Sequence, residues 1–502
     1  VGDMSWLGGG RMPPHASHKR GWDIDVGYFR AAHAAVPYFF FHTNSKTVDP
    51  VGTWALVQEL LETGRVEYIF MARNIQRALY RQALATGALG ASTRAYALAL
   101  GVEPSEINEK WMDALCNPIP QRHVDEGLCQ EVVSEGDDID LAQLPIPVWT
   151  PGKDAGRYIT TTVVTRHAET GIQNYGVYRT LVLGRDRMVS NLSPGRQGYR
   201  YVMSHHELGK PAPIAFIIGA EPAVHLASVT NFPLGFDEIT AAGGLKQEPV
   251  DMVVAKTIDL MVPARTEIVI EGLIHPGEVA QEGPFGEFAG YMGPISDRSV
   301  VRVTAITHRH DPIFYGLSSQ MPPSESTTIQ SLTNAGQLLK VLRHDLGEMG
   351  VEDAHCDLTF GGLLAHVVIA FRPGPPGDAK RIGRLIADLS LFKRVTVVDH
   401  DVDIRDRQHM DWAMNSHYDP ARDTIVIDNV FSPMHMDPSV RIVGGAGQPG
   451  SKVVIDATRS IDAGQLSIPS RENMERARDT WRRADLPDFD IPKRLQFRLD
   501  RA

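Results

Sequence analysis

Two glutamates flank a Gly-Pro-Phe-Gly turn in the stretch QEGPFGEFAGYMG, residues 281–293. The glycines and the proline between Glu282 and Glu287 give a stiff backbone that other groups can approach closely. Two carboxyl groups can carry out acid–base chemistry when burial keeps one protonated and a cation or hydrogen bonds hold the other ionised. The residue types alone also allow a hairpin corner with two solvated acids.

A cation that could pair with one of these acids lies in IQNYGVYRTLVLG, residues 172–184. Arg179 stands in a strand that is otherwise apolar or aromatic, and its planar guanidinium can donate two parallel hydrogen bonds to a carboxylate. Asn174 lies on the opposite face of a regular strand, because successive side chains alternate. A kink or bulge, for which Gly176 is the candidate, is needed to aim both side chains at one site. The alternative is an edge-strand arginine that faces water.

Two further segments could hold charged ligands. Glu238 in FPLGFDEITAAGGL offers oxygen donors that suit Mg²⁺ or Mn²⁺, or else it is an exposed acid at a helix start. In GAGQPGSKVVID, residues 445–456, the order Gly-Ser-Lys is followed by a strand. An NTPase phosphate loop needs Gly-Lys-Ser/Thr leading into a helix, so the pattern argues against that function. Lys452 and the backbone amides around it could still receive another phosphate.

The composition is that of a globular protein with two or three domains. Of the 502 residues, 43% are hydrophobic and 22% are charged, and the formal net charge of −11 argues against a basic nucleic-acid-binding face. No apolar run approaches the ~20 residues that span a bilayer. Three widely spaced cysteines, none in a CxxC pair, indicate free thiols and a cytoplasmic location.

Hydrophobic periodicity shows which elements must position these residues. Strand patterns crowd the region 157–317 and indicate an antiparallel barrel or closed sheet, with a loop-and-helix insertion at 221–245. A single helix is predicted over 324–347, opened by Ser324 and closed by Gly347. Strand–helix–strand alternation follows and indicates a βαβ-type domain. Helices are also predicted at 50–63, 74–85, 91–100 and 104–115, and His205 and His206 are expected on the surface of a polar helix.

Five segments occur in the order of the landmarks of a known family. NYGVYR, DLMVPARTEIVIEG, EGPFGEFAGY, DPARDTIVIDN and GSKVVIDAT resemble motifs of the UbiD-like family of prenylated-FMN-dependent decarboxylases, and the resemblance covers about residues 75–460. EGPFGEFAGY is similar to the signature E-G-P-[FY]-G-[ED], and NYGVYR to an N-x-x-x-x-R segment.

The resemblance implies an α/β (α+β) fold with a central split antiparallel β-barrel. The expected parts are an N-terminal α/β domain with a flexible tail over 1–125, a prenylated-flavin-binding β-barrel over 126–323, a linker helix over 324–350, a C-terminal α/β oligomerisation domain over 351–470 and a charged tail over 471–502.

The resemblance also implies roles for individual residues. Arg179, Glu282 and Glu287 match a Glu–Arg–Glu catalytic network, in which Glu287 would donate the proton that replaces CO₂. Asn174 and Glu238 match two ligands of a divalent metal, Mn²⁺ or Mg²⁺, that ties the cofactor phosphate to the protein. The segment SPGRQG has Gln197 where the family usually has a third ligand, a histidine.

Other positions match cofactor contacts. A K⁺ ion is expected near Ser228, Lys452 matches a phosphate-contacting lysine, and Thr161 matches a cofactor contact on the first barrel strand. Arg179 and the three metal positions complete the expected cofactor-binding set. Parts of 313–330 and 430–445 are expected to form the wall of the substrate pocket.

The implied activity is reversible, non-oxidative decarboxylation of an aromatic or heteroaromatic acid, with an α,β-unsaturated acid as second choice and prenylated FMN as covalent electron sink. The alternatives are a carboxylase of a phenol-like ring and a non-catalytic flavin-binding subunit of a larger decarboxylase complex. A flavin prenyltransferase would supply the cofactor, and the chain is expected to form a homodimer or homohexamer through its C-terminal domain.

Overall fold

The structure is a computed structural model of the 502-residue chain, and all residues described here belong to one of its two units, 87–502. The described residues are 93–358, 366–372, 374–430, 439, 442–443, 446–447, 449–460, 467, 469–484 and 486. The helices predicted at 50–63 and 74–85 lie outside these residues. The helix predicted at 91–100 is seen as α4 (Thr93–Leu100), and the one at 104–115 as a 3₁₀ turn, η1 (Pro104–Glu106), that runs into α5 (Ile107–Cys116).

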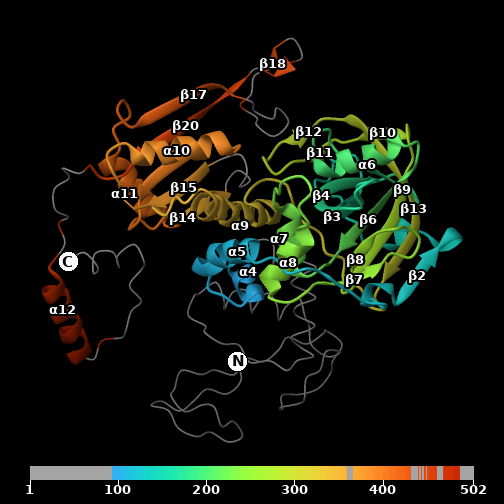
Figure 1. Ribbon diagram of the computed structural model, residues 1–502, viewed down its shortest axis with the longest axis horizontal. Helices are drawn as coiled ribbons and strands as arrows, with labels where there is room; N and C mark the ends of the chain where they lie inside the picture. The colour runs from blue at the N-terminus through green and yellow to red at the C-terminus, as the bar shows by residue number, and fades with distance from the viewer. Residues whose placement is uncertain are drawn as a thin grey trace, which may run out of the picture. The chain divides into compact units, whose positions relative to one another are not determined.

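A closed antiparallel barrel is the main feature of the middle of the chain (Figure 1, green to yellow). Six strands form a ring in the order β13-β5-β4-β3-β6-β9, and β9 pairs with β13 to close it. Two further strands, β10 and β2, pair with β13. The bounds are β2 (Val132–Glu135), β3 (Tyr158–Arg166), β4 (Gln173–Val182), β5 (Arg187–Ser190), β6 (Ala212–Ile218), β9 (Ile268–Ile274), β10 (Val279–Glu282) and β13 (Ser296–His308). The closed sheet expected over 157–317 is confirmed.

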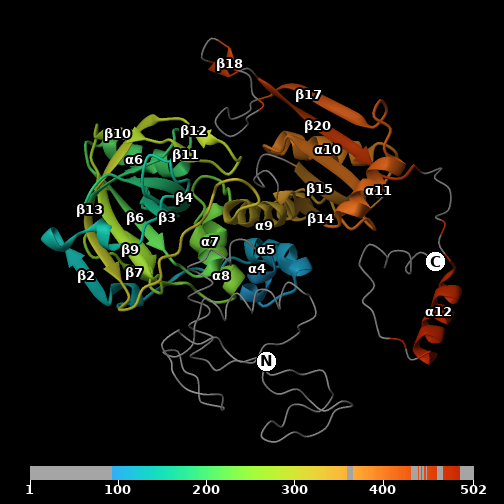
Figure 2. The same cartoon turned by 180° about the vertical axis from the view of Figure 1, so that it is seen from behind.

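Helices cover parts of the barrel. The insertion expected at 221–245 forms α7 (Pro222–Val229) and α8 (Glu238–Lys246), which pack against each other, and Figure 2 shows them from behind. Helix α6 (Gln197–Glu207) packs on β3, β4 and β6. His205 on α6 is therefore buried, and its Nε2 lies 3.0 Å from the Arg166 carbonyl oxygen. The expectation that His205 faces solvent is wrong, because one face of this polar helix lies on the sheet.

Helix α9 (Glu325–Leu339) begins where its sequence predicts. The Ser324 side chain accepts from the Thr327 backbone N–H, and the Thr327 side chain accepts from the Ser324 N–H. The chain then continues as a π-helical turn, η5 (Lys340–Asp345), before Gly347, whose φ is +72°. The predicted helix is thus correct in extent, but its last turn is wider than an α-helical turn.

A mixed five-stranded sheet follows α9 (Figure 1, orange). Its order is β14-β15-β16-β20-β17, in which the two central pairings are parallel and the two outer ones antiparallel. Apolar residues of α9 and α10 pack on one face and residues of α11 on the other, which confirms the predicted βαβ-type domain. The bounds are β14 (Val351–Cys356), β15 (His366–Phe371), α10 (Asp378–Leu389), β16 (Arg394–Asp399), α11 (Arg407–His417), β17 (Thr424–Val430) and β20 (Gly450–Ala457).

The charged tail contains one described helix, α12 (Arg471–Arg483). No described helix combines the length and the apolar content needed to cross a bilayer. Cys116, Cys129 and Cys356 are free thiols.

The packing of α9 on α5 depends on Gly336, because a Cβ at this position would lie 2.5 Å from a ring carbon of the buried Trp111. We expect Gly336→Ala to lower the free energy of unfolding by about 1–3 kcal/mol through overpacking, although alanine favours helix more than glycine. Thermal or urea unfolding measures the change. Ser331→Ala in the same helix adds no atom and serves as the control; a Gly336→Ala variant as stable as this control would contradict the packing argument.

Candidate active site

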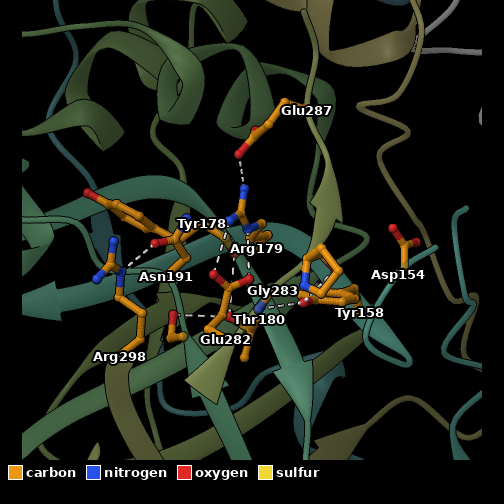
Figure 3. Close-up of polar contacts among 12 residues, drawn as sticks. Asp154, Tyr158, Tyr178, Arg179, Thr180, Asn191, Glu282, Gly283, Glu287 and Arg298 are labelled. Atoms are coloured by element: carbon orange, nitrogen blue, oxygen red, sulfur yellow. Dashed lines mark hydrogen bonds and ion pairs between the residues drawn. The ribbon is translucent and has the colours of Figure 1, made fainter. Parts of the chain in front are cut away.

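Arg179 lies between the two glutamates of the opening motif. Its Nε and Nη2 donate to the two carboxylate oxygens of Glu282 at 2.8 and 3.0 Å, and its Nη1 donates to Oε1 of Glu287. Figure 3 shows the guanidinium with one carboxylate on each side. The sequence predicted this set, and the structure brings the three side chains together although β4 and β10 are not neighbours in the sheet.

The three side chains differ in burial. Glu282 is 0% exposed, Arg179 is 9% exposed, and Glu287 is 16% exposed. Glu287 is thus the member of the network that a molecule from outside can reach most easily. The alternatives of two solvated acids and a water-facing arginine do not fit this geometry.

The electrostatic balance at Arg179 favours its charged form. Burial lowers the pKa of the Arg179 guanidinium, but the hydrogen bonds and charges of Glu282 and Glu287 outweigh burial and raise this pKa above its ordinary value. The guanidinium carbon also lies 5.4 Å from the centre of the Phe285 ring. Arg179 therefore stays a cation, as the partner of a fully buried carboxylate must.

Tyr158 on β3 holds the turn that carries the two acids. Its hydroxyl accepts from the Gly283 backbone N–H at 3.1 Å, and its ring centre lies 4.5 Å from that of Phe285. Burial, and next the charge of Glu282, raise the pKa of Tyr158 above its ordinary value, so the hydroxyl keeps its proton. Figure 3 shows Tyr158 beside Gly283.

A short hairpin presents Glu287. Strands β11 (Phe285–Gly286) and β12 (Met292–Gly293) pair, and the Glu287 N–H donates to the Tyr291 carbonyl oxygen at 2.8 Å. A Cβ on Gly293 would lie 2.7 Å from Glu287 Oε1 and 3.3 Å from the Arg179 guanidinium nitrogens. Only glycine allows the backbone to approach the ion pair this closely.

Asn174 and Glu238 form a second cluster. The Asn174 Nδ2 donates to Glu238 Oε1 at 2.7 Å, and the Tyr175 backbone N–H donates to Glu238 Oε2 at 3.2 Å. Glu238 is 3% exposed, so the alternative of an exposed acid at the start of α8 is wrong. Burial raises the pKa of Glu238 to about 8, although hydrogen bonds from the backbone and from Asn174 act in the opposite direction.

This second cluster fits a hard cation. The Oδ1 of Asn174 is buried and has no hydrogen-bond partner within the described part of the chain, and a carboxylate lies beside it. An amide oxygen and a carboxylate are donors that Mn²⁺ and Mg²⁺ accept. Among the described residues no group of three His, Cys, Asp or Glu side chains could hold a metal ion, so a metal at this place would need other ligands beside the carboxylate, such as amide oxygens.

Gln197, the third predicted metal ligand, is the first residue of α6. Its Nε2 donates to the Tyr201 hydroxyl at 3.1 Å, and the pKa of Tyr201 is raised by burial and also by the charge of Glu238. Glu238 thus acts on Tyr201 through its charge, and no hydrogen bond shown among the described residues joins Gln197 to the Asn174–Glu238 pair. With the amide nitrogen held by Tyr201, the amide oxygen is the atom that remains to bind a cation.

The other predicted cofactor contacts lie at separate places. Thr161 on β3 donates to the Ile217 carbonyl oxygen, and the Ser228 hydroxyl on α7 lies 2.8 Å from that of Thr162. Lys452 belongs to the C-terminal sheet, where its amine donates to backbone carbonyls at the end of α10. The structure therefore brings neither Ser228 nor Lys452 into direct contact with the Asn174–Glu238 pair.

The kink expected at Gly176 is absent from the pairing of β3 with β4. The register runs without a shift from Tyr158↔Leu181 to Arg166↔Gln173. Asn174 and Arg179 do not need to point to one place, because each belongs to a different cluster.

Two family models match the chain. The Rift-related domain of 3-octaprenyl-4-hydroxybenzoate carboxy-lyase (UbiD) matches residues 122–322, and the C-terminal domain of that enzyme matches residues 327–457, which is together more than half of the chain. The chain belongs to the UbiD family. This confirms the resemblance found in the sequence and places the chain among (de)carboxylating enzymes.

Solved UbiD-class structures share this fold. HmfF from Pelotomaculum thermopropionicum, solved with prenylated FMN (prFMN), is 32% identical, with a TM-score of 0.66 over 76% of this chain and 83% of that one. Vanillic acid decarboxylase from Sedimentibacter hydroxybenzoicus is 28% identical, with a TM-score of 0.67 over 78% and 86%. A 3,4-dihydroxybenzoic acid decarboxylase from Enterobacter cloacae is 25% identical, with a TM-score of 0.65 over 78% and 85%. The predicted fold class is confirmed.

Sequence reasoning missed two residues that support the UbiD signature turn. Tyr158 holds Gly283, and an Asp154 carboxylate oxygen accepts from the Gly286 N–H at 3.2 Å. Asp154 occurs in a Gly- and Pro-rich segment, PGKDAG, which by itself indicates only a local turn. A signal for its long-range contact is not present in the sequence.

The raised pKa of Glu238 predicts how the metal-free protein responds to pH. The folded chain holds this proton up to about pH 8, whereas the ordinary pKa is 4.5, so the contribution of Glu238 to stability is greatest at low pH. It falls as the pH rises from about 5 to 8, by roughly 3–5 kcal/mol in total. Thermal melts in EDTA should show this fall, and Glu238→Gln should make it shallower. Glu169→Gln changes an exposed acid and serves as the control, which should keep the pH slope of the parent. If Glu238→Gln also kept the parent's slope, this would contradict the conclusion that protonation of Glu238 causes the fall in stability.

Proposed function

We propose that this UbiD-family chain catalyses the reversible, non-oxidative decarboxylation of an aromatic or heteroaromatic carboxylic acid with prFMN as cofactor. The observation that carries the proposal is the contact of one buried guanidinium with two acids of unequal exposure. The two relatives named above as decarboxylases act on vanillic acid and on 3,4-dihydroxybenzoic acid, which supports an aromatic substrate.

The reaction needs an electron sink, because loss of CO₂ from an sp² carbon leaves an unstabilised carbanion. When bound, prFMN supplies this sink, while the protein contributes placement and a proton. HmfF was solved with prFMN and also with FMN, which supports a flavin in this chain.

Each member of the Glu–Arg–Glu network has a proposed role. Glu287, the most exposed of the three, would deliver a proton to the carbon that has lost CO₂. Arg179 orients the Glu287 carboxyl group through its Nη1, and the bidentate contact with Glu282 keeps the guanidinium in place. A non-catalytic flavin-binding subunit would have no need for this network.

The second cluster is proposed to hold the cofactor at its phosphate end. Asn174, Gln197 and Glu238 would bind Mn²⁺ or Mg²⁺, and a K⁺ ion would lie near Ser228. The Oδ1 of Asn174 has no hydrogen-bond partner among the described residues, which supports a cation at this place. Thr161 stays a predicted cofactor contact. Lys452 stays a predicted phosphate contact, and it would have to exchange the α10 carbonyls for the phosphate.

The same site could also catalyse the reverse of the decarboxylation. Carboxylation of a phenol-like ring is the reverse reaction, and bicarbonate-dependent formation of an acid would reveal it. We also propose that a flavin prenyltransferase supplies the cofactor and that copies of the chain form a homodimer or homohexamer through the C-terminal domain.

The proton-donor role is tested with Glu287→Gln. The amide keeps the shape of the side chain but cannot deliver the proton, so CO₂ release should fall by about 10²-fold or more. Melting temperature and FMN binding should stay close to those of the parent, and Glu169→Gln, an exposed acid on the barrel, should keep full activity. Near-normal turnover by Glu287→Gln would remove the assigned role.

The cofactor is tested by producing the chain with and without a flavin prenyltransferase. Only the co-produced protein should release CO₂ from aromatic acids, and its ultraviolet–visible spectrum should show a bound modified flavin. Protein reconstituted with plain FMN should be nearly inactive. Full activity with plain FMN, or a protein that binds no flavin at all, would overturn the cofactor assignment.

A further inference from the structure

A second arginine lies on the sheet face that carries the Glu–Arg–Glu network. The registers of β4 with β5 and of β5 with β13, continued by one residue, place Arg179, Asn191 and Arg298 in one row across the three strands. The Asn191 N–H donates to the Arg179 carbonyl oxygen at 3.0 Å, which continues the ladder beyond β5. Residues opposite each other in a sheet point to the same face, with Cβ atoms about 5 Å apart. Glu282 is opposite Ser296, two residues before Arg298, and therefore shares this face.

The amide of Asn191 has a defined orientation. Its Oδ1 accepts from Arg298 Nε at 2.7 Å and from the Ser193 hydroxyl at 3.2 Å. A guanidinium can only donate, so the atom it contacts must be the amide oxygen, and the NH₂ group is turned away from Arg298. Figure 3 shows Asn191 between the two arginines. The side chain is half-buried, and its NH₂ group makes no hydrogen bond to another described residue.

Arg298 has a positive charge that no acid compensates in the described part of the chain. Its Nη1 donates to the Asp297 carbonyl oxygen at 2.9 Å, and its Nε is occupied by Asn191. Arg179, in contrast, contacts two carboxylates. Because Arg298 is half-buried, water screens its charge only in part, and its field attracts anions to this face of the sheet.

A carboxylate is the group that these two residues would bind best. The substrate of the proposed reaction is an anion, and it approaches a network that already contains the carboxyl groups of Glu282 and Glu287. A further cation offsets this repulsion, and an amide NH₂ group can donate to a carboxylate oxygen, which only accepts. The cofactor phosphate is proposed to lie near Asn174, about 16 Å along β4 from this row, so it does not compete for the same place.

We infer that Asn191 binds the carboxylate of the substrate through its amide NH₂ group, and that Arg298 is the positioning residue that orients this amide and adds a positive charge. The inference rests on the proposed function and deepens it, because it assigns recognition of the carboxylate to residues outside the Glu–Arg–Glu network. The hydrogen bond exists before CO₂ leaves and stabilises the bound acid. Its loss should therefore raise KM more than it lowers kcat.

The test uses binding, so that it does not depend on turnover. The acid 3,4-dihydroxybenzoic acid and its uncharged derivative 3,4-dihydroxybenzamide are titrated into flavin-loaded Glu287→Gln protein, and flavin absorbance gives each Kd. On this background Asn191→Leu should raise the Kd of the acid about 10-fold or more and the Kd of the amide less than ~3-fold. Asn191→Asp keeps the shape of the side chain but repels an anion, so it should weaken binding of the acid further and again affect the amide little.

Arg298→Met removes both the charge and the hydrogen bond to Asn191, and should also raise the Kd of the acid selectively. Arg298→Lys keeps the charge and should restore part of the affinity for the acid. The difference between the parent and Arg298→Met should shrink at high salt, because salt screens the charge. Arg407→Met removes the same charge from a side chain that is 90% exposed, and as the matched control it should change neither Kd.

An unchanged Kd of the acid in Asn191→Leu, or an equal rise for the acid and the amide, would overturn the inference and indicate that Asn191 and Arg298 only hold the loop before α6. If Asn191→Leu melts at a markedly lower temperature, the decision rests on Asn191→Asp, whose carboxylate can pair with Arg298 and so keep the loop in place. CO₂ release by the unsubstituted enzyme is measured separately and reports on the proposed function alone.

Discussion

A single guanidinium shared by two carboxylates is the interaction on which the described site depends. A carboxylate as deeply buried as that of Glu282 is costly unless a cation with matching hydrogen bonds compensates it, and the fork of Arg179 provides two of them. The contact between Arg179 and Glu282 also joins two strands that are not neighbours in the sheet. Strands β4 and β10 are separated by β5 and β13 in the sheet, and the long Arg179 side chain joins them.

The barrel strand β4 serves two clusters at once. Arg179 and Asn174 are five residues apart on an unbroken strand, which corresponds to about 16 Å along its axis. One cluster has the arginine and the acids, and the other has oxygen donors suited to a cation. A flavin mononucleotide has a ring at one end and a phosphate at the other, so a rigid strand with two distinct ends is a suitable support for it. The proposed chemistry and the proposed cofactor anchoring thus share one structural element.

Several features of the chain could be predicted because they depend on local patterns. Alternating apolar residues predicted the barrel strands, and Ser324 predicted the start of α9, since both signals involve neighbours in sequence. The π-helical turn after α9 and the burial of His205 could not be predicted in this way. Both depend on what packs against the helix, and the same local sequence could lie on a surface.

The sequence by itself determined the family, the closed sheet of the middle of the chain, the helix after it, the strand–helix–strand domain that follows, and the residue types of the site, because these are carried by short motifs and local periodicity. It could not decide whether Glu282 and Glu238 are solvated or buried, nor that Tyr158 and Asp154 support the turn around Glu287. Only the tertiary structure decided these points. Barrel closure brings segments more than 100 residues apart into hydrogen-bonding contact, as the pairing of Arg179 with Glu282 and of Tyr158 with Gly283 shows. Burial, and therefore the energetics of each charge, is a property of those long-range contacts.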